Sequence, residues 1–223
     1  IGSRVRLSWP ALGQEVELEV IEAVFGQRLV YRAGDSVTEF SFDSTGVRLR
    51  HSGPDVALDP AGVEASWRLA LAELAFSLEC HPGRSRRVRW SLRSLQVSPE
   101  RAYSLFTEPD YLNQWLTLHA TLGAVQEPYA LTLRSGLTLS GRVLVAVPGR
   151  DVGLTVDNHA GALLKLRTLP APPELGRWLC LSWARWGRER AEDALICAEL
   201  DRALDALTYE FERGPRRSGV TLH

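Results

Sequence analysis

The sequence predicts an α+β protein in which a run of antiparallel strands is followed by one long helix, and this order occurs twice along the chain. Three observations predict it. Apolar and polar residues alternate through the first third of the chain, as in strands with one face in water. Near residue 59 the alternation gives way to an apolar stripe at three- and four-residue spacing, which is typical of a helix. The same two patterns return beyond residue 84.

The first run of alternation predicts an antiparallel meander between residues 5 and 49. Turn-forming residues separate its strands at positions 10–13, 25–27, 33–35 and 44–46. Asp59 and Pro60 then suit the start of a helix, which ends at residues 81–83 with a His-Pro-Gly sequence. We expect this helix to cover the first sheet with an apolar stripe that consists of Val63, Trp67, Ala70, Leu71, Leu74 and Leu78.

A second domain is predicted over residues 84–213, and it opens with elements that the first lacks. Val88, Trp90 and Leu92 alternate as a strand, and two short helices begin near Pro99 and Pro109. Strands are expected at 116–125, 129–133, 137–147, 152–156, 162–169 and 178–183. A last helix follows at about 188–212, with the stripe Leu195, Ile196, Leu200, Ala203, Leu204, Leu207 and Phe211. We expect residues 214–223 to form a flexible tail.

Internal comparison predicts two tandem copies of one fold. Residues 5–31 and 131–156 share the order strand, turn, strand, turn, strand, and both halves then close with a hairpin and a long helix. The first copy, residues 1–83, lacks the strand and two short helices that open the second copy. Because the chain begins at Ile1 and contains no methionine, we expect that further residues precede it and that the first copy is incomplete at its N-terminus.

Local sequence sharpens the fold prediction. Residues 97–115 read VSPERAYSLFTEPDYLNQW, which resembles the opening helices of the activator of Hsp90 ATPase homologue-like family. Residues 20–31 resemble a strand–turn–strand segment of that family, and residues 63–78 resemble its last helix. Gln114 departs from the pattern, since many relatives have arginine before the tryptophan. The family belongs to the START-like, or Bet v 1-like, superfamily, so the resemblance implies a helix-grip fold, in which a long C-terminal helix lies across a curved antiparallel sheet.

The helix-grip fold implies an apolar pocket between the long helix and the sheet. We therefore expect a START-like binding module that holds a small hydrophobic or amphipathic ligand. The candidate pocket residues of the second copy are Trp90, Tyr103, Trp115, Leu118, His119, Leu133, Leu154, Leu164, Trp178 and Leu204. The alternative for the large apolar residues in this set is that they fill the core.

Two other functions stay open on the sequence alone. The first is an enzyme of the cyclase or hydratase type, in which a pocket acid or base such as His119 transfers a proton. The second is a noncatalytic interaction scaffold with filled cores, or a stress-response co-chaperone-like protein. The sequence contains no nucleophile elbow, phosphate-binding glycine loop, Cys-x-x-Cys pair or His-Glu-x-x-His helix, so we expect no catalytic residue set, cofactor or metal.

Charge and hydropathy exclude other partners. The 26 basic and 27 acidic side chains give a formal net charge of −1, so no whole-chain field attracts nucleic acid. One basic stretch, with two arginines of the tail, is the only candidate patch for nucleic acid or phospholipid. Because no aromatic stacking platform accompanies its charge, we expect a solvated linker instead. Its residues are Arg84, Arg86, Arg87, Arg89, Arg216 and Arg217. Apolar runs fall short of the ~20 residues of a membrane span, and no secretory signal is seen. Cys80, Cys180 and Cys197 suit reduced thiols, so we expect a cytoplasmic protein.

Overall fold

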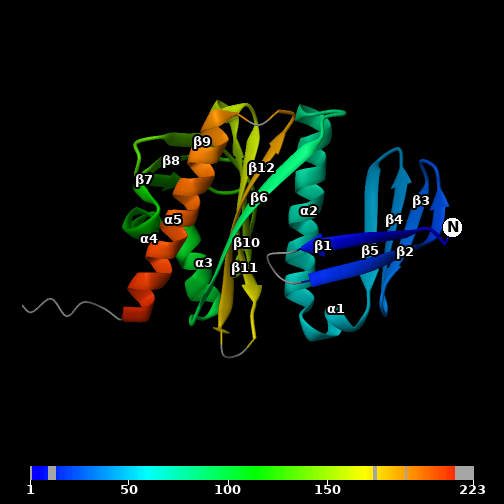
Figure 1. Cartoon of the computed structure of the whole chain (residues 1–223). Coiled ribbons are helices and arrows are strands. Elements are labelled where there is room, and N and C mark those ends of the chain that lie inside the picture. Colours follow the sequence, from blue (N-terminus) through cyan, green and yellow to red (C-terminus); the bar gives the residue numbers. More distant parts are fainter. Residues whose placement is uncertain (1, 10–13, 173–174, 189, 214–223) are drawn as a thin grey trace, which may run out of the picture. The chain divides into compact units, whose positions relative to one another are not determined.

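A computed structural model describes residues 2–9, 14–172, 175–188 and 190–213 (Figure 1). The predicted tail at 214–223, with Arg216 and Arg217, lies outside the described residues. The chain divides into two compact units, Ile1–Glu64 and Ala65–His223. The division thus falls inside a helix, whereas the sequence places a boundary between residues 83 and 84.

The first unit contains a five-stranded antiparallel meander in the consecutive order β1-β2-β3-β4-β5. The strands are β1 (Arg4–Trp9), β2 (Gln14–Val24), β3 (Arg28–Ala33), β4 (Ser36–Asp43) and β5 (Gly46–Ser52). Two helices follow, α1 (Pro54–Leu58) and the start of α2 (Pro60–Cys80). The alternation in the sequence therefore predicted the meander correctly.

The second unit contains a seven-stranded antiparallel sheet in the order β6-β12-β11-β10-β9-β8-β7, so its first and last strands are neighbours. The strands are β6 (Arg86–Leu95), β7 (Thr117–Leu122), β8 (Pro128–Leu133), β9 (Thr138–Val147), β10 (Asp151–Val156), β11 (Ala162–Pro170) and β12 (Arg177–Trp186). Helices α3 (Pro99–Thr107), α4 (Pro109–Trp115) and α5 (Ala191–Arg213) complete it. The α+β class, the antiparallel sheets and the long C-terminal helix are confirmed, and the element order is consistent with a helix-grip fold.

The predicted helix starts near Pro99 and Pro109 are also found. Ser98 caps α3 by accepting a hydrogen bond from the backbone N–H of Arg101, and Pro99 stands in the first turn. Pro109 has the same position in α4. The Ser98 cap and the two first-turn prolines favour helix starts at these positions, and α4 then ends at Trp115, which is buried.

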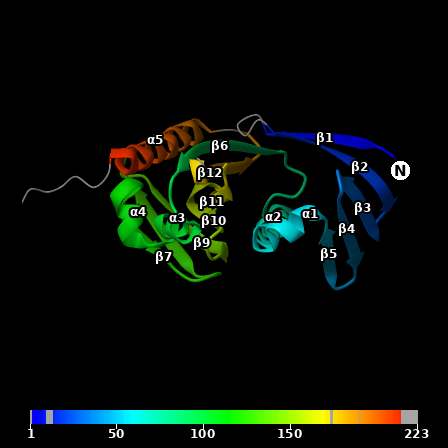
Figure 2. The ribbon, with the colours of Figure 1, turned by 90° about the horizontal axis from the view of Figure 1, so that it is seen from below.

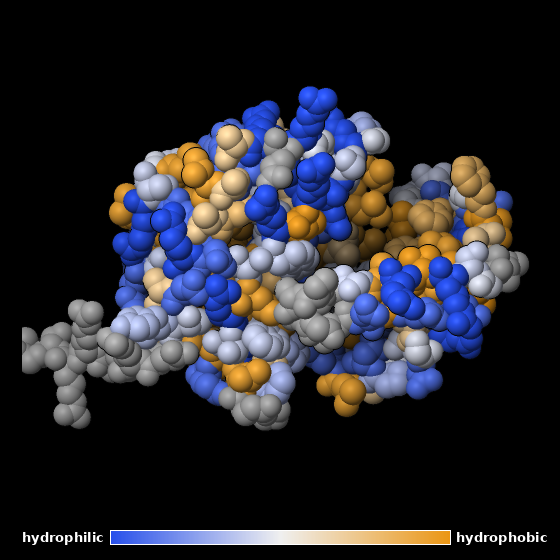
Figure 3. All heavy atoms as spheres, viewed as in Figure 1, coloured by the Kyte–Doolittle hydropathy of each residue, from blue (hydrophilic) through white to orange (hydrophobic). Residues whose placement is uncertain are grey.

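The inner face of the sheet packs against α3, α4 and α5. Its strands contribute Leu154, Leu164 and Leu181 to one continuous core, and α5 contributes Ile196, Leu200, Leu204 and Leu207. Leu195, which the predicted stripe of α5 includes, is instead 71% exposed. Figure 3 shows apolar residues interspersed with hydrophilic ones over this side of the second unit.

The outer face of the same sheet is covered by α2, which from Ala65 on belongs to the second unit. Figures 1 and 2 show α2 and α5 on opposite faces of the sheet. The buried residues of α2 are Ala65, Leu69, Glu73 and Phe76. This stripe differs from the predicted one, because Leu74 and Leu78 are 46% and 65% exposed. Phe76 packs in a second core cluster with Leu163, Ala184 and Trp186.

An ion pair fixes α2 on this outer face. Lys165 of β11 and Glu73 of α2 are 5% and 7% exposed, and the Lys165 Nζ donates to the Glu73 Oε2 at 2.8 Å. Arg86 of β6 also donates to Glu73, while Trp186 donates its indole N–H to the Ser77 hydroxyl at 2.8 Å. Burial lowers the pKa of Lys165 below its usual value. The segment that the sequence assigns to the first copy therefore completes the second sheet.

Among the helices that the structure describes, none combines the length and the apolar character needed to cross a bilayer.

Candidate functional site

Six of the ten predicted pocket residues meet between the sheet and helices α3 to α5. Trp115, Leu133, Leu154, Leu164 and Leu204 are each at most 2% exposed and belong to the continuous inner core. Tyr103 of α3 is half-buried and packs at the edge of that core. These side chains thus pack against one another, and they fill the space between α5 and the inner face of the sheet.

The other four predicted residues do not reach this core. Trp90 is 42% exposed, and its ring lies 5.4 Å from the Lys165 Nζ, which places it on the outer face beside α2. Trp178 follows the same alternation as the outer-face residues of β12. Leu118 is 58% exposed and His119 is also exposed, because a register shift in β7 between Thr117 and His119 turns both side chains outward.

The error at Trp90 has a simple cause. The apolar side chains of β6 were expected to face the long helix, but in this sheet both faces are covered by helices. The residues of β6 that face α5 include Arg93, whose guanidinium donates to Asp205 at 2.5 Å and to Asp201 at 3.1 Å, both on α5. The apolar side of β6 lies on the opposite face of the sheet, where Val88 packs against the core cluster that includes Phe76 of α2.

A cavity of about 540 Å³ lies between the end of α4, the β8–β9 turn and α5, at one end of the space between α5 and the sheet. We name it the α4–α5 pocket, and its lining residues are Gln114, Trp115, Leu116, Arg134, Ser135, Glu199, Arg202, Ala203, Ala206 and Glu210. Of the predicted residues, Trp115 is the one that lines it. The Trp115 indole N–H donates to the carbonyl oxygen of Leu105 at 2.9 Å, which fixes the ring in place.

The polar side of the α4–α5 pocket is organised by Glu199. This carboxylate is 9% exposed and accepts hydrogen bonds from the Ser135 backbone N–H at 2.8 Å and the Ser135 hydroxyl at 2.5 Å. Arg134 donates to the carbonyl oxygens of Asn113 and Gln114, which ties the β8–β9 turn to the end of α4. The pocket therefore places fixed acidic and basic groups beside an apolar wall, an arrangement that suits an amphipathic ligand.

No sequence pattern pointed to these polar residues. Ser135 and Glu199 are 64 residues apart, and each has an ordinary local interpretation, as a turn residue and as a helix surface residue. The pairing depends on the crossing of α5 over the β8–β9 turn, so only the three-dimensional structure reveals it.

The first unit contains three hydrogen-bonded side chains whose arrangement resembles the nucleophile, base and acid of a catalytic triad. Thr38 Oγ1 lies 2.8 Å from His51 Nδ1, and His51 Nε2 lies 2.7 Å from Asp55 Oδ2. Thr38 is only 2% exposed, so a substrate would not reach its hydroxyl. Ser36 also donates to Asp55 at 2.6 Å. We interpret these hydrogen bonds as a structural network that joins α1 to β4 and β5.

The described part of the chain contains no group of three or more His, Cys, Asp or Glu residues arranged to hold a metal ion.

Comparisons with known proteins show similarity of fold. No family model matches the chain, and no curated protein matches it. The solution structure of the Aha1 dimer from Colwellia psychrerythraea matches with a TM-score of 0.50 and 16% identity, over 56% of this chain and 96% of that one.

Two further solved structures have lower TM-scores. A conserved protein of unknown function from Enterococcus faecalis matches at 0.45 with 15% identity, over 65% of this chain and 86% of its own. A protein from Chromobacterium violaceum matches at 0.42 with 22% identity, over 56% and 97%. The likeness to Aha1 supports an Aha1-like helix-grip fold for about half of the chain.

Proposed function

We propose that this chain is a START-like binding module of the activator of Hsp90 ATPase homologue-like type, and that it holds a small amphipathic ligand in the α4–α5 pocket. The observation that carries the proposal is the volume and lining of this pocket. About 540 Å³ lies within the ~300–1,000 Å³ that is usual for small-molecule sites. The ligand's apolar part would contact Trp115 and Ala203, and its polar part would face Arg202 and Glu199.

The sequence predicted a ligand site in the middle of the space between α5 and the sheet, whereas the proposed site lies at one end of that space. The fully buried side chains of Leu133, Leu154 and Leu164 leave the inner core filled. The same filled core favours a second candidate function, an interaction scaffold that takes up no small molecule. The exposed position of His119 gives the proton-transfer alternative no support.

We also propose that residues 1–83 are an incomplete copy of the fold in residues 84–213. Strands β1 to β5 form a consecutive meander followed by the 21-residue helix α2, and strands β8 to β12 form a consecutive meander followed by the 23-residue helix α5. This match of element order supports the tandem origin.

Dye binding to matched tryptophan variants tests the pocket. The probe is 1-anilinonaphthalene-8-sulfonate, which combines an apolar ring system with an anionic group. We expect saturable fluorescence enhancement with the unmodified chain, and its loss in Ala206→Trp, which fills the pocket from α5. Ala194→Trp adds the same side chain at an exposed position of α5 that does not line the pocket and should bind the dye normally.

Native mass spectrometry supplies an independent measurement. A bound small molecule that is released on denaturation would identify a natural ligand. Equal dye signals from all three proteins, together with native and denatured masses that both equal that of the bare chain, would overturn the pocket proposal and favour the scaffold.

A further inference from the structure

The four charged side chains that line the α4–α5 pocket have no ion-pair partner in the described part of the chain. They are two acids and two bases, Glu199, Glu210, Arg134 and Arg202. Glu210 and Arg202 are exposed, but Glu199 is only 9% exposed. A buried charge is usually paired, because its removal from water is costly. The pocket therefore contains charges of both signs to which the described residues supply no counter-charge.

Glu199 lines the pocket with lone-pair positions still unused. Its two oxygens accept hydrogen bonds from the Ser135 backbone N–H and the Ser135 hydroxyl, whereas an ionised carboxylate has about four lone-pair positions. Both donors are neutral, so they hold the carboxylate in place without balancing its charge. An ammonium group of a ligand would supply the missing charge and donate to the remaining positions.

Arg202 supplies the opposite charge one turn further along α5. The rise of an α-helix places it about 4.5 Å from Glu199 along the helix axis. The Arg202 Nε donates to the carbonyl oxygen of Ala198 at 3.2 Å, while the terminal nitrogens of its guanidinium make no hydrogen bond to a residue that the structure describes. Arg134 instead donates to two carbonyl oxygens of α4, so Arg202 is the better placed of the two bases to bind an anionic group.

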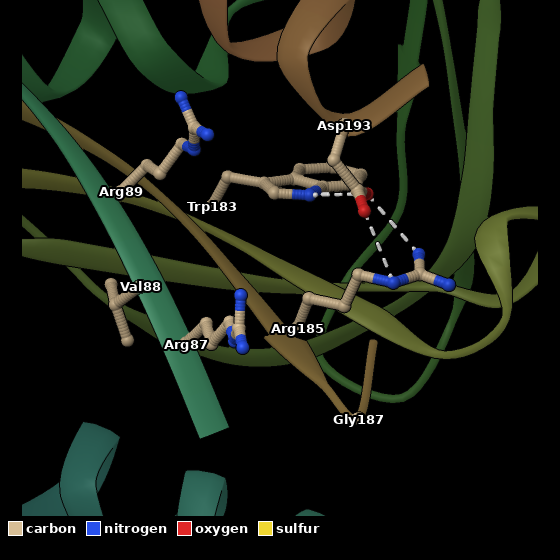
Figure 4. A pocket seen from close by; sticks show the side chains of 7 residues that line it. All are labelled: Arg87, Val88, Arg89, Trp183, Arg185, Gly187 and Asp193. Carbon is tan, nitrogen blue, oxygen red and sulfur yellow. Dashed lines mark hydrogen bonds and ion pairs between the residues drawn. The ribbon is translucent and has the colours of Figure 1, made fainter. Parts of the chain in front are cut away.

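A second cavity of the same unit shows the contrasting case, in which acid and base pair with each other. Its volume is about 180 Å³, and it lies beside β6, β12 and the start of α5 (Figure 4). Arg185 and Asp193 are both buried there, with the Arg185 Nε 3.1 Å from the Asp193 Oδ2. Arg86, Arg87 and Arg89, which were expected in a solvated linker, lie on β6 and also have partners. The charged side chains of this region thus already interact within the protein, unlike those of the α4–α5 pocket.

We propose that the α4–α5 pocket binds a zwitterion with an apolar chain, whose ammonium group contacts Glu199 and whose neighbouring anionic group contacts Arg202. This inference rests on the proposed function and adds the charge of the ligand's polar part. The apolar chain lies against Trp115, Ala203 and Ala206. An apolar α-amino acid and a single-chain ethanolamine phospholipid share this chemistry, because each carries an ammonium group a few bonds from a carboxylate or a phosphate.

Calorimetric titration with matched compounds tests the charge requirement and distinguishes the two sources. L-Phenylalanine is the soluble zwitterion, 2-phenylethylamine lacks its carboxylate, and 3-phenylpropionate lacks its ammonium group. Lysophosphatidylethanolamine and lysophosphatidic acid, each below its critical micelle concentration, are the zwitterionic and anionic lipids. In at least one of the two sets we expect the zwitterion to bind roughly tenfold or more tightly than its analogues without the second charge.

Two charge variants assign the contacts. Glu199→Gln should weaken binding of the zwitterion by roughly tenfold without weakening the anionic analogue, whereas Arg202→Gln should weaken both. Because Arg202 is exposed, its variant tests the proposal even where the loss of Glu199 disturbs the β8–β9 turn. The matched controls are Glu79→Gln and Arg48→Gln, which remove exposed charges outside the pocket and should bind like the unmodified chain.

Equal affinities of the zwitterion and its analogues, binding of neither zwitterion, or an equal loss of affinity in the control variants would overturn this inference. Dye binding that Ala206→Trp abolishes, combined with any of these results, would leave the proposed pocket standing and refute only the zwitterion assignment. Loss of both dye binding and zwitterion binding in the unmodified chain would refute both, so the two failures are distinguishable.

Discussion

Removing the charge of Glu73 should destabilise the second unit more than removing the charge of Lys165. In Glu73→Gln the ammonium of Lys165, which is 5% exposed, loses its counter-charge while Arg86 and Arg167 stay nearby. Leaving one member of a buried ion pair alone typically costs about 3–5 kcal/mol. In Lys165→Met the carboxylate keeps its hydrogen bond from Arg86, so we expect the smaller loss of about 1.5–3 kcal/mol that is usual for a hydrogen bond to a charged group.

The double variant Glu73→Gln/Lys165→Met gives the sharpest test. It should be more stable than Glu73→Gln alone, because no buried ammonium is left without a counter-charge. Urea unfolding followed by far-ultraviolet circular dichroism gives the free energies of unfolding. Glu79→Gln, at an exposed position of the same helix, serves as control and should change stability by less than about 0.5 kcal/mol.

The pH dependence of Glu73→Gln has a definite sign. The pKa of Lys165 is already lowered by burial, and loss of Glu73 lowers it further. Between this folded-state pKa and the higher unfolded-state pKa the unfolded chain binds more protons, so the stability deficit of Glu73→Gln should shrink as the pH rises through this range. A deficit that does not change with pH, or a double variant less stable than Glu73→Gln, would refute the buried-pair argument.

The remaining predictions concern thiols and packing. Burial raises the pKa of Cys180 to about 11 from 9.0, whereas Cys80 is exposed, so an aromatic disulfide reagent should label Cys80 rapidly and Cys180 only on unfolding. The raised pKa also contributes stability that is present below pH 9 and lost as the pH rises towards 11; Cys180→Ala should reduce this alkaline loss in urea titrations. Leu204 is 0% exposed, so Leu204→Trp should cost about 1–3 kcal/mol by overpacking, and an unchanged urea midpoint would show that the inner core is not filled. A chain that starts at residue 65 should unfold cooperatively, whereas one that starts at residue 84 exposes the outer face of the sheet and should aggregate; equal thermal stability of the two would contradict the docking of α2.

The sequence predicted the strands and helices well because each one carries its own periodicity. The alternation through β1 to β5 and the proline-marked starts of α3 and α4 are local signals, and the structure confirms them. In contrast, the local sequence of a helix does not determine which sheet surface the helix packs against. The stripe of α2 that is buried on the second sheet includes Glu73, a charged residue that every hydropathy pattern places in water. Its burial depends on Lys165, 92 residues later in the chain.

The candidate site was only partly predictable for the same reason. Leu154, Leu164 and Leu204 could be assigned to one interior from the order of elements, since a long helix after a meander must cover it. Trp90 was assigned to the wrong face, because alternation shows that two faces exist but not which one meets α5. The α4–α5 pocket involves charged side chains from distant segments, and sequence spacing gives no signal for such groups.

The buried position of Lys165 also means that the reactivity of its amine can report on local opening of the structure. It is the single lysine among 26 basic side chains, so acylation or reductive methylation has one lysine side chain to modify, and that amine lies beneath α2. The rate at which Lys165 reacts would therefore follow how often α2 separates from the sheet, in the way that hydrogen exchange follows local opening. Amine-directed cross-linkers would in turn give little information on partners of this chain, and carboxyl- or thiol-directed reagents are better suited to finding them.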